Sequence, residues 1–158
     1  MDLELREKVA LVTGGSKGIG FACAKALADE GCRVAIVSRS RENVDRACSA
    51  LPGANGFCAD LADPRAAASL ATQVQDEIGP IDILVNSAGA ARRTPPDQLT
   101  PGAWRAAMDA KFFSYINVID PVIKAMAGRG SGVVANIIGN AARSRLLSIF
   151  PAARRMPR

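Results

Sequence analysis

Residues 9–20 read Val9-Ala10-Leu11-Val12-Thr13-Gly14-Gly15-Ser16-Lys17-Gly18-Ile19-Gly20 in a chain of 158 residues. The apolar, β-branched beginning of this stretch predicts a buried strand, and its glycines predict a tight turn. Phe21, Ala24 and Leu27 then recur at helical spacing. A turn between a strand and a helix presents unpaired backbone N–H groups and the positive end of the helix dipole, which together favour a bound phosphate.

The glycines of this turn have separate expected roles. We expect Gly14 to let the chain turn, Gly18 to let a pyrophosphate approach the backbone, and Gly20 to let the helix pack on the sheet. Residues 14–18 also match the G-x-S-x-G pattern of serine hydrolases, but that mechanism needs a histidine and the chain has none. The G-x-x-x-x-G-K-[ST] phosphate loop does not fit, because Lys17 precedes Gly18.

The composition predicts one globular domain in the cytoplasm. About half of the residues are apolar, the apolar runs are too short to cross a membrane, and the beginning of the chain lacks the layout of a signal peptide. The four cysteines have no C-x-x-C spacing, so we expect small buried side chains and no metal site. They are Cys23, Cys32, Cys48 and Cys58.

The net charge of +5 comes from the end of the chain. Residues 143–158 contain five arginines, and no acidic residue follows Asp120. A basic tail can bind nucleic acid, which would make binding strongly salt-dependent. Because this tail has little aromatic interleaving and no helix with one basic face, nucleic-acid binding is not expected. We therefore divide the chain into a domain at 1–142 and an arginine-rich tail at 143–158.

Strand and helix patterns alternate along the domain. Apolar strands are predicted near 9–13 and at 33–38, 56–59, 81–85 and 133–138. Helices are predicted after Ser40, from Asp63-Pro64 to about residue 78, and from Thr100-Pro101 to residue 128, with cap residues and prolines marking their starts. Such alternation predicts an α/β fold with a doubly wound parallel sheet of about five strands.

The last of these helices carries an apolar stripe. Its steps of four or three residues predict one buried face over more than six turns, with Pro121 expected to kink the helix or loosen a turn. The stripe consists of Trp104, Met108, Phe112, Tyr115, Ile119, Ile123 and Met126.

Three motifs together resemble the short-chain dehydrogenase/reductase family. Thr13-Gly14-x-x-x-Gly18-x-Gly20 is followed by Asp60-Leu61 and then by Asn86-Ser87-Ala88-Gly89, over roughly residues 6–140. The resemblance implies a Rossmann-type sheet that binds NAD(P), with Asp60 at the adenine, 86–89 beside the nicotinamide ribose, and Asn86 steadying the sheet. The candidate cofactor-binding residues are Thr13, Gly14, Ser16, Lys17, Gly18, Ile19, Gly20, Ser38, Arg39, Asp60, Leu61, Asn86, Ala88 and Gly89.

The charges near these motifs predict NADP(H) rather than NAD(H). Selection for NAD needs a carboxylate at the end of the second strand, to accept a hydrogen bond from the ribose 2′-OH. This chain has Ser38-Arg39 there and Lys17 in the glycine turn. Two cations suit a 2′-phosphate, where a charge-assisted contact contributes roughly 1.5–3 kcal/mol.

The family's catalytic residues have no match, so no catalytic residue is predicted. Where the family has its asparagine after a W-x-x-x-M-D-x pattern the chain has Lys111, and Gly139 stands at the serine position. Residues 151–157 lack the family's Tyr-x-x-x-Lys. A shifted reading frame or a premature stop near residue 142 would produce such a junction. The alternatives are thus a reductase that acts on a small carbonyl or alcohol, and a non-catalytic NADP(H)-binding module.

Lys111 and Tyr115 lie on or beside the apolar stripe. We expect the Lys111 ammonium to reach water, with a contact to the cofactor ribose or a proton relay as the alternative. Tyr115 is expected to pack in the core. The family also associates through two long helices, of which residues 100–128 supply the first, so a homo-oligomer is possible.

Overall fold

The computed structural model describes residues 3–89 and 94–139, and it contains a parallel sheet in the order β3-β2-β1-β4-β5. The strands are β1 (Val9–Thr13), β2 (Arg33–Ser38), β3 (Asn55–Cys58), β4 (Ile81–Asn86) and β5 (Val133–Asn136). The helices between them are α1 (Gly18–Asp29), α2 (Arg41–Ala50), α3 (Pro64–Glu77), α4 (Pro101–Met108) and α5 (Ser114–Arg129). This confirms the doubly wound α/β fold and its five strands within the described residues.

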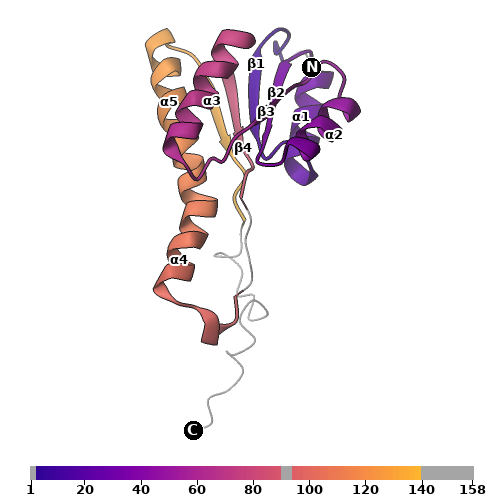
Figure 1. Cartoon of the computed structure of the whole chain (residues 1–158). Coiled ribbons are helices and arrows are strands. Elements are labelled where there is room, and N and C mark those ends of the chain that lie inside the picture. The colour runs from indigo at the N-terminus through magenta and orange to yellow at the C-terminus, as the bar shows by residue number, and fades with distance from the viewer. Residues whose placement is uncertain (1–2, 90–93, 140–158) are drawn as a thin grey trace.

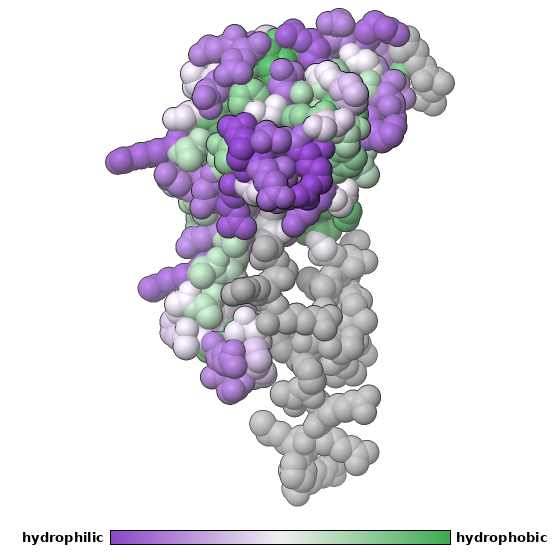
Figure 2. All heavy atoms as spheres, turned by 45° about the vertical axis from the view of Figure 1, so that its right-hand side comes forward, coloured by the Kyte–Doolittle hydropathy of each residue, from purple (hydrophilic) through white to green (hydrophobic). Residues whose placement is uncertain are grey.

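Helices cover both faces of the sheet. Figure 1 shows α1 and α2 on one side and α3 and α5 on the other, with α4 extending past the end of the sheet. Since both faces are covered, β1 is buried along its whole length, which explains why its sequence is apolar throughout. One core cluster joins the sheet to α3 and α5 through Leu70 and Val118, and the other joins it to α1 through Ala24. On the face seen in Figure 2, hydrophilic side chains cover much of the globular part.

The helix starts follow the predicted caps. The Ser40 hydroxyl accepts a hydrogen bond from the Asn43 N–H at 3.3 Å, and the Asp63 carboxylate accepts one from the Arg65 N–H at 2.9 Å. Thr100 caps α4 in the same way, through the N–H of Ala103. Each cap satisfies an N–H that the first helical turn leaves without a partner.

Three strands differ from their predicted bounds, and one of them, β4, ends one residue later than predicted, at Asn86. β3 begins and ends one residue early, and β5 ends at Asn136 rather than at residue 138. The Ile137 N–H still donates to the Asn86 carbonyl at 2.8 Å. Because β4 itself ends at Asn86, the ladder stops there.

The predicted single stripe on the last helix is confirmed only in part. A π-helical segment, η2 (Asp109–Phe113), separates α4 from α5, and a π turn adds a residue and so rotates the side chains of the next helix. Trp104 in α4 and Phe112 in the π-helical segment are at least half exposed, because α4 lies past the sheet and neither element buries a residue in the described chain. The buried face of α5 contains Tyr115 and Met126 from the predicted stripe together with Val118 and Val122, whereas Ile123 is exposed. Pro121 lies inside α5, which continues to Arg129.

The cysteines are only partly as expected. All four are free, and Cys32 is buried while Cys58 is exposed at the end of β3, where its thiol donates to the Arg39 carbonyl at 3.2 Å. Burial raises the pKa of the Cys32 thiol, with the Glu30 carboxylate adding to the effect. Within the described residues no cluster of three potential metal ligands occurs and no helix could span a membrane.

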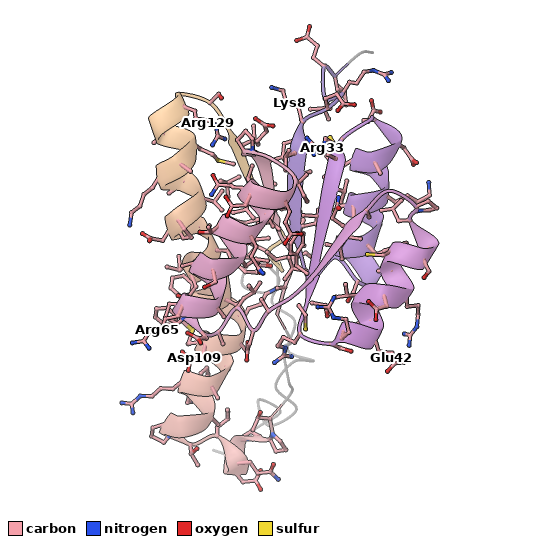
Figure 3. The ribbon with its side chains drawn as sticks, turned by 45° about the horizontal axis from the view of Figure 1, so that its top comes forward. Lys8, Arg33, Glu42, Arg65, Asp109 and Arg129 are labelled. Carbon is pink, nitrogen blue, oxygen red and sulfur yellow. The ribbon has the colours of Figure 1, made fainter. Side chains whose placement is uncertain are left out.

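The amino-terminal ends of the strands carry a separate set of basic residues. Figure 3 shows Lys8, Arg33 and Arg129 at this end of the sheet. Arg129 donates to the Ile81 carbonyl at 2.6 Å and so ties the end of α5 to the start of β4. These side chains lie away from the carboxyl ends of the strands, where parallel sheets bind their ligands.

Thr13 joins the carboxyl ends of β1 and β4. Its fully buried hydroxyl accepts hydrogen bonds from the N–H groups of Ser87 at 3.1 Å and Ala88 at 3.2 Å, and lies 3.4 Å from the Asn86 side-chain oxygen. Asn86 in turn donates to the side-chain oxygen of Asn136 at 3.0 Å. Three strand ends are therefore connected through side chains.

We expect Thr13→Val to destabilise the protein by about 2 kcal/mol, because it removes a fully buried hydroxyl and leaves the partly buried Ala88 N–H without this partner. Urea denaturation measures this change. The control is Thr72→Val on α3, whose exposed hydroxyl bonds only the Ala68 carbonyl one turn earlier. That change should stay within about 0.5 kcal/mol, and equal losses for the two variants would contradict the role given to Thr13.

Candidate functional site

A cavity of about 490 Å³ lies over the carboxyl ends of the strands. The chain leaves β1 toward β2 on one side and returns to β4 on the other, so β1 marks the switch point at which doubly wound sheets bind ligands. The volume falls in the range of about 300–1,000 Å³ usual for cofactor and small-molecule sites. The lining residues are Gly14, Lys17, Ile19, Ser38, Arg39, Ser40, Asn43, Ser87, Ala88, Gly89, Lys111 and Ile137.

The floor of this cavity is the turn between β1 and α1. Gly14 has φ +64°, and a Cβ there would lie 2.8 Å from backbone atoms of Ala88. At Gly20 a Cβ would collide with the Gly14 carbonyl oxygen. Neither position can hold a side chain, which is why the turn lies flat against the end of β4.

The amino terminus of α1 opens toward the cavity. Lys17 is its N-cap residue and makes no side-chain capping bond, in contrast to Ser40 and Asp63 at α2 and α3. Gly18 has φ +57°, and no atom lies within 4 Å of where its Cβ would be. The first turn of α1 therefore presents backbone N–H groups beside open space, which suits an anionic group.

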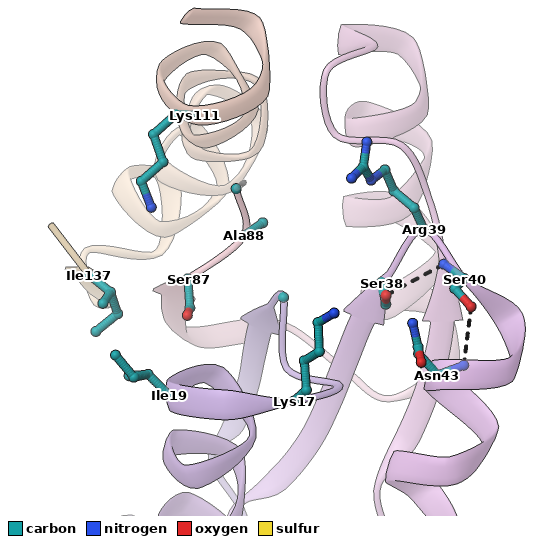
Figure 4. Close-up of a pocket in the computed structure, with 12 residues that line it drawn as sticks. Lys17, Ile19, Ser38, Arg39, Ser40, Asn43, Ser87, Ala88, Lys111 and Ile137 are labelled. Atoms are coloured by element: carbon teal, nitrogen blue, oxygen red, sulfur yellow. Dashed lines mark hydrogen bonds between the residues drawn. The ribbon is translucent and has the colours of Figure 1, made fainter. Parts of the chain in front are cut away.

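The side chains that line the cavity include cations but no carboxylate. Figure 4 shows Lys17 rising from the glycine turn and Arg39 at the end of β2. Arg39 is followed by the start of α2, where the Ser40 N–H lies 3.4 Å from the Ser38 hydroxyl oxygen. The region between Lys17 and Arg39 is positively charged and rich in hydroxyl and amide donors.

A second cavity of about 260 Å³ adjoins the first and shares Ser38, Arg39 and Gly89 with it. Asp60 and Leu61 line this second cavity. Asp60 is exposed, and its carboxylate also accepts the Ala62 N–H at 3.1 Å, so it shapes the turn after β3 as well. Together the two cavities extend along the carboxyl ends of the strands, from β3 to β5.

The predicted site residues fall into three groups. Gly14, Lys17, Ile19, Ser38, Arg39, Ala88 and Gly89 line the main cavity, and Asp60 and Leu61 line the second. Thr13, Ser16, Gly18, Gly20 and Asn86 line neither. Thr13, Gly20 and Asn86 are buried beneath the turn, so they position the site rather than form its surface.

Five lining residues were not among the predicted site residues. Ser87 lies inside the Asn86–Gly89 motif and could have been included on that ground. Ser40 and Asn43 belong to the first turn of α2, directly after Arg39. Ile137 follows β5, and Lys111 comes from the π-helical segment.

Lys111 does not simply extend into water, contrary to the expectation from sequence. It is half-buried, its ammonium donates to the Tyr115 hydroxyl at 3.1 Å, and its stem lies against Gly89. Tyr115 is buried, as expected, and its hydroxyl donates to the Ile137 carbonyl at 2.9 Å. The lysine is therefore held at the side of the cavity that lies next to β4 and β5.

The comparisons with known proteins agree with this geometry. The family model for short chain dehydrogenases matches residues 8–151. The acetoacetyl-CoA reductase of Paracoccus denitrificans is 38% identical over 82% of this chain and 54% of its own length. The D-threitol dehydrogenase of Mycolicibacterium smegmatis is 37% identical over 89% of this chain and 56% of its own.

Among solved structures, the F189W variant of actinorhodin polyketide ketoreductase with NADPH superposes with a TM-score of 0.84 at 28% identity, over 92% of this chain and 59% of its own. The chain spans about half the length of the curated relatives it matches. The glycine turn, the parallel sheet and the family match over most of the sequence lead to one conclusion: this chain belongs to the short-chain dehydrogenase family.

Proposed function

We propose that this chain binds NADP(H) as the cofactor-binding part of an oxidoreductase that acts on a small carbonyl or alcohol compound. The observation that carries the proposal is the main cavity, in which the glycine turn, Lys17 and Arg39 meet. When bound, the cofactor would supply or accept a hydride at its nicotinamide ring. The chain itself would bind and orient it.

The residues present fit a dinucleotide. The glycine turn leads into the amino terminus of α1, and the space beside Gly18 is open, which suits the diphosphate. Ser87, Ala88 and Gly89 line the β4 side of the cavity, where we place the nicotinamide ribose. The second cavity with Asp60 is the place we propose for the adenine.

The preference for NADP(H) rests on charge at the end of β2. Selection for NAD relies on a carboxylate there, and this chain has Ser38, Arg39 and Ser40 instead. A guanidinium can contact a phosphate through two parallel N–H groups, so Arg39 suits the 2′-phosphate, with Lys17 as a second cation.

The alternative is a non-catalytic NADP(H)-binding module. Its support is the sequence: Lys111 and Gly139 stand at the positions where the family has its asparagine and serine, and Tyr115 is the one tyrosine. Since Tyr115 is buried and donates to the Ile137 carbonyl, it is not placed as a general acid. We also propose a cytoplasmic location, because the four cysteines are free, as is usual in a reducing compartment.

A homo-oligomer is a further part of the proposal. Large apolar side chains are exposed along α4, the π-helical segment and α5, among them Trp104, Phe112, Ile116 and Ile123. We expect sedimentation velocity to give at least a dimer, and Trp104→Glu to shift it toward the monomer, because the variant places a charge in an apolar contact. An unchanged sedimentation coefficient would place the interface elsewhere.

The cofactor preference can be tested by fluorescence titration of the full chain with NADPH and NADH. We expect NADPH to bind more tightly, and Arg39→Ala to weaken NADPH by roughly tenfold or more while NADH changes little. The matched control is Arg33→Ala, which removes the same charge at the other end of β2. Equal or tighter binding of NADH by the unmodified chain would exclude the preference.

Catalytic competence is tested by following NADPH absorbance in the presence of a simple ketone such as cyclohexanone. We expect saturable NADPH binding without measurable oxidation by this chain, since loss of a positioned general acid costs roughly 10²–10⁴ in rate. Heat-denatured protein gives the background. Turnover above that background would show that the chain reduces ketones and would exclude the non-catalytic module.

A further inference from the structure

We infer that Lys111 is a third cation of the dinucleotide site and binds the nicotinamide-ribose half of the ligand. This inference rests on the proposed function, because it assigns a residue to the same cavity. Lys111 lies outside the sequence motifs that led to the site.

Its place follows from the order of the strands. Arg39 comes directly after β2, whereas Lys111 lies against Gly89 after β4 and is connected through Tyr115 to Ile137 after β5. Since β1 separates β2 from β4, the two cations lie on opposite sides of the glycine turn. Figure 4 shows this arrangement, with Lys111 and Ile137 on one side of the cavity and Arg39 on the other.

The lysine is held in place by its own helix. The π-helical segment turns it toward Gly89, where a Cβ would come within 2.7 Å of the lysine Cδ. Four residues later, Tyr115 accepts one hydrogen bond from the ammonium, which lies 5.0 Å from the centre of the tyrosine ring. Tyr115 uses its own proton for the Ile137 carbonyl, so its oxygen is free to act as the acceptor.

The Lys111 ammonium keeps donors for a ligand. An ammonium has three N–H groups, and in the described chain one of them is used, by Tyr115. No carboxylate in residues 3–89 and 94–139 forms an ion pair with it. A half-buried cation at a cavity wall, anchored by a neutral hydroxyl, is suited to acceptor oxygens that arrive with a ligand.

A dinucleotide places such oxygens on this side of the turn. With the 2′-phosphate at Arg39 and the diphosphate over Gly14, the remaining half of the molecule extends toward Ser87–Gly89 and Lys111. Its ribose hydroxyls and its phosphate are the acceptors within that half. Lys111 therefore acts on the nicotinamide half, and Arg39 on the adenosine half.

The test compares Lys111→Met and Arg39→Ala in the full chain, using calorimetric titration with NADPH and with 2′,5′-ADP, which lacks the nicotinamide half. The readout is the ratio of the two dissociation constants. We expect Lys111→Met to raise the dissociation constant of NADPH by about tenfold and to change that of 2′,5′-ADP by no more than about twofold. Arg39→Ala should weaken both ligands.

Tyr115→Phe is the second variant, because it removes the anchor and keeps the ring. We expect Tyr115→Phe to lose less affinity than Lys111→Met, and to lose it again only for NADPH. This variant replaces Lys111→Met in the test if Lys111→Met does not fold. Thermal unfolding without ligand shows which variants are folded.

Three results separate the possibilities. If the unmodified chain binds neither ligand, the proposed function itself is wrong. If the chain binds NADPH but neither Lys111→Met nor Tyr115→Phe changes the ratio of dissociation constants, the role of Lys111 is excluded while the proposed function stands. Equal weakening of both ligands by Lys111→Met also excludes it, because that result indicates a general disturbance of the turn.

Discussion

The close approach of two backbones at the ends of β1 and β4 is the constraint on which the rest of the site depends. Gly14 lies so near Ala88 that no side chain fits between them, and the Thr13 hydroxyl binds the N–H of the same Ala88. This contact fixes the glycine turn against the segment after β4. The two walls of the cavity are therefore set by one contact between backbones.

The fold could be predicted because its signals are local or repeat along the chain. Strands buried on both faces show as apolar runs, and the caps at Ser40, Asp63 and Thr100 mark helix starts through bonds to residues two or three positions away. The roles of Gly14 and Gly20 could be predicted for a related reason, since only glycine permits such close packing of backbone on backbone.

The features that the sequence did not predict depend on which parts of the fold cover each residue. A repeat of three and four residues indicated one buried stripe, but the stripe is buried only where α5 packs on the sheet, at Tyr115 and Met126, and not along α4, which extends past the sheet. Cys58 looked like a buried residue because cysteines commonly are, and it lies exposed at the short β3. The position of Lys111 depends on the π-helical segment, which no spacing rule in the sequence indicated.

The positive charges at the two ends of the main cavity also interact with each other. Lys17, Arg39 and Lys111 line one cavity, and no carboxylate lines it. The three positive charges therefore repel one another. An anionic ligand that spans the cavity relieves this repulsion at both ends, whereas a ligand that fills one end relieves it only there. Under the proposed function, these charges favour a long, multiply charged molecule over its fragments. Tyr115 adds to this selectivity, because a neutral hydroxyl holds the Lys111 ammonium in place without neutralising its charge.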